Sequence, residues 1–223
     1  MHTNKKLNHK IILGTPRSGT TFVSNWYANE NKDHQRLSEE IGFEHFEPDH
    51  QSWPELGDKD GIDQETKFRI QKHLTQSSIF KLHPGPDMSN HIFEYIKNKP
   101  VIVVERKDVL GQFLSYGIGW TTNKWHHYVD KTTPLNGLNE NQTFYYEKKW
   151  FDDLSLRLAL FNNVVQDLII EREVWFEDLS NWTNNDSIML RQNPQSNNEK
   201  LDLLTNKDQF LDWYNDFENS NNK

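Results

Sequence analysis

The sequence predicts an α/β fold of three layers, in which a central parallel sheet is flanked by helices. Short apolar runs such as Val101–Val104 recur along the chain, and longer segments with helical periodicity separate them. Strands that are separated by helices favour a parallel sheet with right-handed crossover connections. The length of 223 residues fits one domain over residues 1–223, with disordered tails expected at 1–9 and 218–223.

The first half of the chain is predicted to hold two strands and two helices around a long connection. The apolar residues Ile11–Leu13 form the first strand, and apolar-periodic residues predict a helix over Gly19–Glu30. Residues 31–64 are rich in acidic residues and histidine and are expected to be mostly connection. A helix is then predicted over Glu65–Thr75, and a short buried strand over Ser78–Leu82.

Glycine, proline and apolar periodicity divide the second half of the chain into further elements. In order, these are predicted as a helix from Asp87 to Lys97, a strand over Val101–Val104, a helix over Asp108–Tyr116, a loop over Trp120–Gln142, a helix over Phe144–Glu171, a strand over Glu173–Phe176, a mobile segment over Asn181–Lys200 and a helix over Lys207–Phe217. Gly117 and Gly119 are expected to stop the helix that begins at Asp108. Ligands of a parallel sheet bind at the carboxyl ends of its strands, where Gly14, His83 and Arg106 fall.

The most informative segment is Lys10–Phe22, which holds a strand, a loop of small residues and the start of a helix. The N–H groups of such a loop and the N-terminus of the helix bind anions. The spacing Gly14-x4-Gly19 is that of a nucleotide-binding P-loop, but Thr20 stands where a nucleoside-triphosphate kinase or ATPase carries lysine. The cation lies instead within the loop, as Arg17. The predicted fold is therefore P-loop NTPase-like; the alternative for this segment is an ordinary glycine turn.

The sequence Pro-Arg-Ser-Gly-Thr-Thr-Phe at residues 16–22 resembles the 5′-phosphosulfate loop of sulfotransferases, whose donor is 3′-phosphoadenosine 5′-phosphosulfate (PAPS). The resemblance implies that this loop surrounds the 5′ side of the nucleotide. It also implies that Phe22 lies against the adenine, where the family usually has tryptophan. The cofactor-binding residues implied in the loop are Thr15, Arg17, Ser18, Gly19, Thr20, Thr21 and Phe22.

A second motif begins at Arg106, which follows the clearest apolar strand, and Ser115 lies nine residues further on. A guanidinium group binds phosphate with a planar set of donors, and a hydroxyl adds a further hydrogen bond. The motif resembles the Arg-x-Asp and Gln-x-x-Ser pattern of bacterial trehalose-type sulfotransferases at Arg106, Asp108, Gln112 and Ser115. The resemblance implies that Arg106 and Ser115 hold the 3′-phosphate of PAPS. The alternatives are a surface salt bridge for Arg106 and a solvent-facing helix position for Ser115.

The segment Phe-Lys-Leu-His-Pro, ending at residue 84, resembles the Lys-Thr/Ser-His element of cytosolic sulfotransferases, whose histidine is the general base. Trehalose-type enzymes share the lysine but use a glutamate about twenty residues past the loop, where this chain has Glu39 and Glu40. His83 is the preferred base, because a histidine suits proton abstraction at neutral pH whereas a carboxylate needs burial to raise its pKa. Glu39 and Glu40 remain alternatives, and so does a turn histidine without a chemical role. The resemblance also implies that Arg17 and Lys81 offset the charge on the departing phosphate.

Two further segments are less specific. Val174–Leu179 resembles a Val-x-Tyr-Glu-Asp-Leu segment that sulfotransferases carry late in the chain, and it is expected to support the fold and orient loops. The aromatic segment Trp120–Tyr128 is either a platform for an acceptor or a loop that packs its own rings on the domain.

The sequence therefore predicts a PAPS-dependent sulfotransferase that acts on a hydroxyl of a small molecule or a glycan, with a carbohydrate or glycolipid favoured. An ATP-dependent P-loop kinase and a non-catalytic anion-binding protein are the alternatives. The identity of the acceptor and the formation of a homodimer are left open.

Composition limits the partners of the chain. The net charge of −8 argues against broad binding to nucleic acid or anionic membranes. No cysteine is present and no metal-binding spacing such as His-Glu-x-x-His occurs, so no metal is expected. The longest apolar run is far too short to span a bilayer, and the polar N-terminus does not resemble a secretory signal. A cytoplasmic location without membrane insertion is therefore expected.

Overall fold

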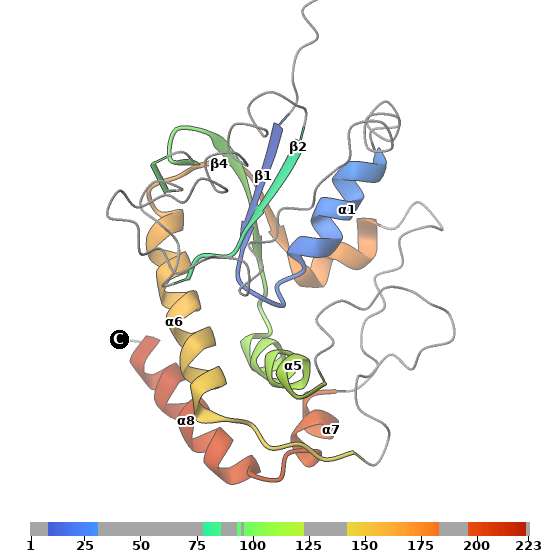
Figure 1. The fold of residues 1–223 in the computed structure, drawn as a ribbon, viewed down its shortest axis with the longest axis vertical. Helices are drawn as coiled ribbons and strands as arrows, with labels where there is room; N and C mark the ends of the chain where they lie inside the picture. The colour runs from blue at the N-terminus through green and yellow to red at the C-terminus, as the bar shows by residue number, and fades with distance from the viewer. Residues whose placement is uncertain are drawn as a thin grey trace, which may run out of the picture.

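A computed structural model describes residues 9–30, 78–85, 93–94, 96–122, 142–182 and 196–221 of the chain. Four strands form one sheet in the order β2-β1-β3-β4, and every neighbouring pair is parallel (Figure 1). The strands are β1 (His9–Gly14), β2 (Ser78–Leu82), β3 (Pro100–Glu105) and β4 (Ile169–Trp175). The predicted α/β class and the parallel sheet are thus confirmed.

The register of the sheet aligns the carboxyl ends of β1, β2 and β3. Leu13 pairs with Leu82, and Gly14 pairs with Val104. His83 directly follows β2, and Arg106 directly follows β3. The three motifs found in the sequence therefore lie at one edge of the sheet.

Helices cover both faces of the sheet, because alternate residues of its buried strands point to opposite sides. Figure 1 shows α1 (Thr20–Glu30) and α6 (Lys148–Val165) on opposite sides of the strands. The buried cluster on the side of α6 consists of Ile11, Leu13, Leu82, Ile96, Val101, Val103 and Phe161. The cluster on the side of α1 and of the 3-10 helix η1 (Phe176–Trp182) consists of Ile12, Phe22, Val23, Ile102, Val104, Val174 and Leu179.

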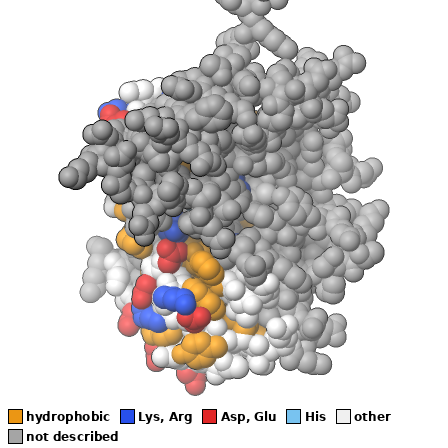
Figure 2. Space-filling model, in the orientation of Figure 1, with side chains coloured by type: hydrophobic (Ala, Val, Ile, Leu, Met, Phe, Trp, Pro, Cys, Tyr) orange, Lys and Arg blue, Asp and Glu red, His pale blue; other side chains and the backbone are white. Residues whose placement is uncertain are grey.

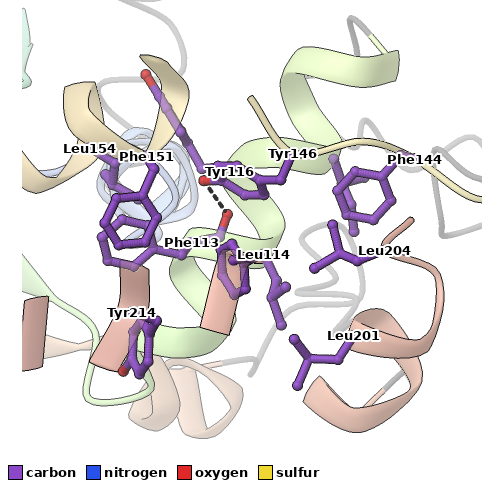
Figure 3. Packing of buried hydrophobic residues seen from close by; sticks show 12 residues of the cluster. Phe113, Leu114, Tyr116, Phe144, Tyr146, Phe151, Leu154, Leu201, Leu204 and Tyr214 are labelled. Carbon is purple, nitrogen blue, oxygen red and sulfur yellow. Dashed lines mark hydrogen bonds between the residues drawn. The ribbon is translucent and has the colours of Figure 1, made fainter. Parts of the chain in front are cut away.

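A second hydrophobic core lies below the sheet in the view of Figure 1, among α5 (Val109–Thr122), α6, α7 (Asn197–Asp202) and α8 (Lys207–Asn221). It is rich in aromatic rings: Phe113 stacks on Phe151 with ring centroids 4.5 Å apart. The hydroxyl of Tyr146 donates a hydrogen bond to the carbonyl oxygen of Phe113 at 3.0 Å (Figure 3). This core fixes α5, whose first turn carries the residues that follow Arg106.

The outer surfaces of α6 and α8 carry charges of both signs. Lys148 pairs with Asp152 along α6, and Lys207 at the start of α8 pairs with Asp202 at 2.7 Å. In Figure 2, basic, acidic and hydrophobic side chains are intermixed over the lower part of the viewed face. The described residues of this face therefore form no broad basic patch.

The prediction that Gly117 and Gly119 stop a helix is wrong, because α5 continues through both to Thr122. A Cβ atom on Gly117 would lie 2.3 Å from Cε2 of Tyr146. Tyr146 is fully buried, and its hydroxyl is held by Phe113. Glycine at this position thus lets the ring of Tyr146 pack closely against α5, and it does not mark the end of the helix.

The predicted boundaries around α6 and β4 are also wrong. The helix was expected over Phe144–Glu171, but α6 begins at Lys148 because Phe144 instead forms a parallel bridge with Leu204. The helix ends at Val165, where turn hydrogen bonds follow, and β4 begins at Ile169, four residues before the predicted strand over Glu173–Phe176. A continuous apolar pattern across this helix-to-strand junction concealed the change of structure.

Two differences concern the C-terminal part. The segment Asn181–Lys200 was predicted to be mobile, but its end begins α7, and Ser196 and Glu199 form a capping box there. The last helix continues to Asn221, beyond the predicted end at Phe217, so residues 218–221 are helical and not part of a disordered tail. The side chains of Ser220 and Asn221 donate to carbonyl groups one turn earlier and so support this extension. The predictions for residues 31–64 and Glu65–Thr75 lie outside the described residues, as does the segment 123–141.

Candidate functional site

Two backbone features shape the loop between β1 and α1. A Cβ atom on Gly14 would lie 2.6 Å from the carbonyl oxygen of Val104 and 2.7 Å from Oγ of Ser18, so only glycine fits at the end of β1. Arg17 and Gly19 have φ angles of 66° and 97°, in the left-handed region. Such turns let successive N–H groups converge on an anion. The loop therefore contains two left-handed residues, which suit a backbone that binds an anion.

Gln112, a residue of α5, fixes the loop through side-chain hydrogen bonds. Its Nε2 atom donates to Oγ1 of Thr15 at 2.6 Å and to the carbonyl oxygen of Pro16 at 2.7 Å. The side chain of Gln112 is buried, so these bonds form away from solvent. Gln112 matched the sequence pattern, but it was not among the predicted site residues. It fixes the first half of the loop to the helix that carries Ser115.

The centre of the loop offers donors to an anion. Ser18 is 0% exposed, yet its hydroxyl has no hydrogen-bond partner among the described residues. An unsatisfied buried polar group costs about 1–3 kcal/mol, so such groups are rare in the absence of a ligand. α1 begins two residues later at Thr20, and its first N–H groups have no partner within the helix. Together they form a site for one anionic group.

Arg17 and Ser115 meet at this site although 98 positions separate them in the chain. Nε of Arg17 donates to Oγ of Ser115 at 2.8 Å, and Nη1 of Arg106 donates to the carbonyl oxygen of Arg17 at 3.4 Å. Burial and the nearby charge of Arg106 lower the pKa of Arg17 to about 10. Arg17 therefore stays protonated at neutral pH. Two adjacent cations, both partly buried, indicate a site for a multiply charged anion.

The alternative considered for Arg106, a surface salt bridge, is present only in part: Nη2 pairs with Oδ2 of Asp108 at 3.2 Å, but the guanidinium group itself is largely buried. The Arg106 side chain is only 9% exposed, and its Nε atom is buried without a hydrogen-bond partner among the described residues. The guanidinium group also lies over the ring of Phe176, with its central carbon 4.5 Å from the ring centroid. One carboxylate thus offsets part of the charge, and a buried donor is left for a ligand.

Lys81 reaches the loop from β2. Its Nζ atom donates to Oγ1 of Thr21 at 3.0 Å, and the residue is 1% exposed. Burial lowers the pKa of Lys81 to about 7. An anion bound in the loop would stabilise the protonated form and raise this pKa again.

The pKa of Lys81 predicts how stability changes with pH. Above pH 7 the folded protein releases the Lys81 proton, while the unfolded chain keeps it up to the ordinary pKa of 10.5. Since the unfolded state then binds more protons, the free energy of unfolding should rise with pH between these values, by up to about 1.4 kcal/mol per unit. Urea unfolding at pH 7.5, 8.5 and 9.5 measures this slope. Lys81→Met should show a clearly smaller rise, to which the lowered pKa of Lys200 still contributes. Lys149→Gln, a change at an exposed lysine, should keep the full rise; equal slopes in all three proteins would contradict the assignment.

His83 lies beside the loop, with its Nδ1 atom 2.7 Å from the carbonyl oxygen of Gly14. A carbonyl oxygen can only accept, so Nδ1 carries the proton of this hydrogen bond. A neutral His83 ring then has its lone pair on Nε2. This tautomer is the one that a general base acting through Nε2 requires.

Lys200 is a further cation of the site, and sequence reasoning missed it. It is buried on α7, and its pKa is lowered by burial and by the charges of Arg106 and Arg17. Asn197, one turn earlier on the same helix, donates to Oδ1 of Asp108 at 2.8 Å and so fixes α7 against the start of α5. The capping-box sequence at Ser196 and Glu199 was the available signal for this helix.

The remaining predicted residues stand as follows. Phe22 belongs to the buried cluster beneath α1, and its contact with adenine stays a prediction. Trp120 lies in α5, is 42% exposed and stacks on Trp150 at 6.2 Å, so it packs against the domain at least on one side. Glu39 and Glu40 lie outside the described residues.

Comparisons with protein-family models, with curated proteins and with solved structures found no match to this chain. No helix in the described part of the chain has both the length and the apolar character needed to cross a membrane. Within the same residues, no group of three or more His, Cys, Asp or Glu side chains is placed to hold a metal ion.

Proposed function

We propose that the protein is a PAPS-dependent sulfotransferase of P-loop NTPase-like fold, which transfers a sulfuryl group to an acceptor hydroxyl. One observation carries the proposal: the loop cation Arg17 lies 2.8 Å from Ser115, beside Arg106, at the edge of the sheet where the loop begins. A nucleotide with anionic groups at its 5′ and 3′ positions fits this arrangement, because the loop can bind the 5′ group and the adjacent Arg106 and Ser115 can bind the 3′ group.

The donor atoms of the site fit such a nucleotide. The hydroxyl of Ser18 and Nε of Arg106 are buried without partners among the described residues, and each can donate to a phosphate oxygen. Arg17, Lys81 and Lys200 add positive charge in a chain whose net charge is −8. Local cations in an acidic protein favour a small, highly charged ligand over an extended polyanion.

The side chains around the loop support in-line transfer to a hydroxyl. His83 takes the proton of the acceptor hydroxyl on Nε2 as the acceptor oxygen bonds to sulfur. The bond from sulfur to the 5′-phosphate oxygen breaks, and the bisphosphate leaves. Arg17, Lys81 and the N–H groups of the loop stabilise the negative charge that grows on the departing oxygen, and such fixed donors are usually the largest catalytic contribution. Glu39 and Glu40 remain the alternative bases.

An ATP-dependent kinase is the main alternative function, and a non-catalytic anion-binding protein is the other. Thr20 stands where a kinase needs its lysine, and its buried side chain packs inward against Gly14. A protein that only binds anions needs neither Lys81 nor His83, yet both contact the loop. These contacts favour a transferase.

A thermal-shift experiment separates the three functions. Adenosine 3′,5′-bisphosphate should stabilise the protein by about 2.7 kcal/mol at 100 times its dissociation constant, and ATP with magnesium should not. Arg106→Ala should weaken bisphosphate binding to the level of adenosine 5′-phosphate, because it removes the guanidinium group proposed for the 3′-phosphate. Protection by ATP alone would overturn the proposal in favour of a kinase. Protection by simple anions without nucleotide preference would favour the binding protein.

The acceptor in this proposal is a hydroxyl of a small molecule or glycan, with a carbohydrate or glycolipid favoured. The cytoplasm is the proposed compartment. Incubation with labelled PAPS and fractionated glycan extracts tests the acceptor class, and transfer of label to a carbohydrate fraction is the expected result.

A further inference from the structure

The turn that presents Arg106 is held by a carboxylate from another part of the chain. Oε2 of Glu177 accepts a hydrogen bond from the N–H group of Lys107 at 3.1 Å, and Oε1 accepts one from the N–H group of Asp108 at 3.0 Å. These two N–H groups directly follow Arg106 and precede α5. Glu177 therefore fixes the backbone from which the Arg106 side chain extends.

The neighbouring residue, Phe176, contacts both halves of the site. The guanidinium group of Arg106 lies over its ring at 4.5 Å from the centroid. A Cβ atom on Gly19 would lie 2.9 Å from Cδ2 of the same ring and 2.8 Å from Cδ1 of Leu179, so η1 packs directly against the phosphate loop. One ring thus lies between the loop and Arg106, and it contacts both.

Arg106 also contacts the loop directly, through a hydrogen bond of 3.4 Å from Nη1 to the carbonyl oxygen of Arg17, and it contacts its own turn. Asp108 accepts from Nη2 of Arg106 at 3.2 Å, and its other oxygen accepts from the N–H group of Gly111 at 2.9 Å. Asp108 lies within this turn, and Asn197 on α7 donates to its Oδ1 atom at 2.8 Å. Beside the long hydrogen bond to the carbonyl oxygen of Arg17, Phe176 and Glu177 on η1 are therefore the contacts that fix the position of Arg106 relative to the phosphate loop.

We propose that Phe176 and Glu177 are positioning residues that set the placement of Arg106 relative to the phosphate loop, and so determine selectivity for a nucleotide with a second phosphate. This inference rests on the proposed function, because the second phosphate is the 3′-phosphate of PAPS. Neither residue needs to touch the ligand: Glu177 acts through the N–H groups of the turn, and Phe176 acts through the face of its ring.

The test compares two ligands on matched variants. Glu177→Ala should raise the Kd for adenosine 3′,5′-bisphosphate about tenfold and change the Kd for adenosine 5′-phosphate less than twofold, measured by isothermal titration calorimetry. Asp178→Ala is the matched control, because it removes the same charge from the next, exposed position of η1; both Kd values should stay as in the wild type. Phe176→Leu should act like Glu177→Ala, while Phe176→Tyr keeps the ring and should restore selectivity.

Repeating the Glu177→Ala change in an Arg106→Ala protein distinguishes a positioning role of Glu177 from a general loss of structure. In Arg106→Ala, the further change Glu177→Ala should leave the bisphosphate Kd unchanged, since no guanidinium group remains to be positioned. An equal loss of affinity for both ligands, or an undiminished effect of Glu177→Ala in the Arg106→Ala background, would overturn the inference alone. A wild-type protein that does not distinguish the bisphosphate from adenosine 5′-phosphate would overturn the proposed function, and the inference with it. If Glu177→Ala does not fold, Phe176→Leu and Phe176→Tyr decide between these outcomes.

Discussion

Arg17→Gly should lower the rate of sulfuryl transfer by about 100- to 1,000-fold. This is the usual loss of rate when one fixed hydrogen-bond donor to the charge that develops in the transition state is removed. The side chain of Arg17 is the cation of the loop, and its Nε atom is bonded to Ser115 at 2.8 Å. Glycine removes that cation and keeps the backbone conformation, because φ at this position is 66°. A radiolabel-transfer assay with PAPS at saturating concentration measures the effect on turnover.

The same variant should unfold no more easily than the wild type. A left-handed conformation costs an L-residue roughly 1–2 kcal/mol, and glycine avoids this cost. The lost hydrogen bond to Ser115 is worth about 1 kcal/mol. Removing a partly buried cation that lies close to Arg106 also relieves desolvation and repulsion. Activity and stability should therefore change in opposite directions, or stability should stay constant, in urea unfolding.

Arg17→Lys is the control for charge, since it keeps a cation but loses the planar donor set. It should retain more activity than Arg17→Gly and less than the wild type. A turnover rate of Arg17→Gly within tenfold of the wild-type rate would show that the cation of the loop does not contribute to catalysis. A large loss of stability in that variant would show that Arg17 has a structural role instead.

The sequence predicted those parts of the fold that are determined by local pattern. The strands at Ile11–Leu13, Ser78–Leu82 and Val101–Val104 are short apolar runs bounded by turn residues, and all three are confirmed. The helix after the loop was predicted from Gly19, one residue before it begins. Parallel pairing then followed from the alternation of strands and helices, and it brings the sequence motifs to one edge of the sheet.

Elements decided by distant contacts were predicted incorrectly. Gly117 resembles a helix stop in the sequence, but it is required within α5 by the buried ring of Tyr146, 29 positions further on. Phe144 continues the apolar period of α6, yet it pairs with Leu204 outside any helix. In each case a tertiary partner overrides a local preference, and the local sequence carries no signal of that partner.

The candidate site shows the same division. Arg17, Ser115 and Arg106 were predicted from motif spacing, and the structure brings them together. Lys200 and Glu177 were not predicted as site residues. They lie on α7 and η1, and no spacing of residues in the sequence predicts that these two helices pack on α5 and on the loop. A motif therefore identifies residues within one strand, loop and helix. The residues of other elements that hold the motif in place are identified only from the three-dimensional structure.

His83→Ala should reduce turnover by about 10²- to 10⁴-fold and leave the Kd for adenosine 3′,5′-bisphosphate within about twofold of the wild type. The reason for the first effect is the loss of the Nε2 base. The reason for the second is that the ring donates to the Gly14 carbonyl and is not among the groups proposed to hold the nucleotide, so the proposed nucleotide contacts remain. Single-turnover transfer and calorimetry measure the two quantities on the same protein.

His83→Asn is the variant that distinguishes chemistry from loop support. The asparagine amide can donate to the Gly14 carbonyl in place of Nδ1, but it has no basic atom. If His83 is the general base, the asparagine variant should be as inactive as His83→Ala, and Glu39→Gln and Glu40→Gln should both transfer at near-normal rates. If His83→Asn instead restores activity while one of the two glutamine variants is inactive, then His83 only holds the loop, and that glutamate abstracts the proton. The base is thereby assigned by which atom the reaction requires, because the Gly14 contact is present in both the wild type and the asparagine variant.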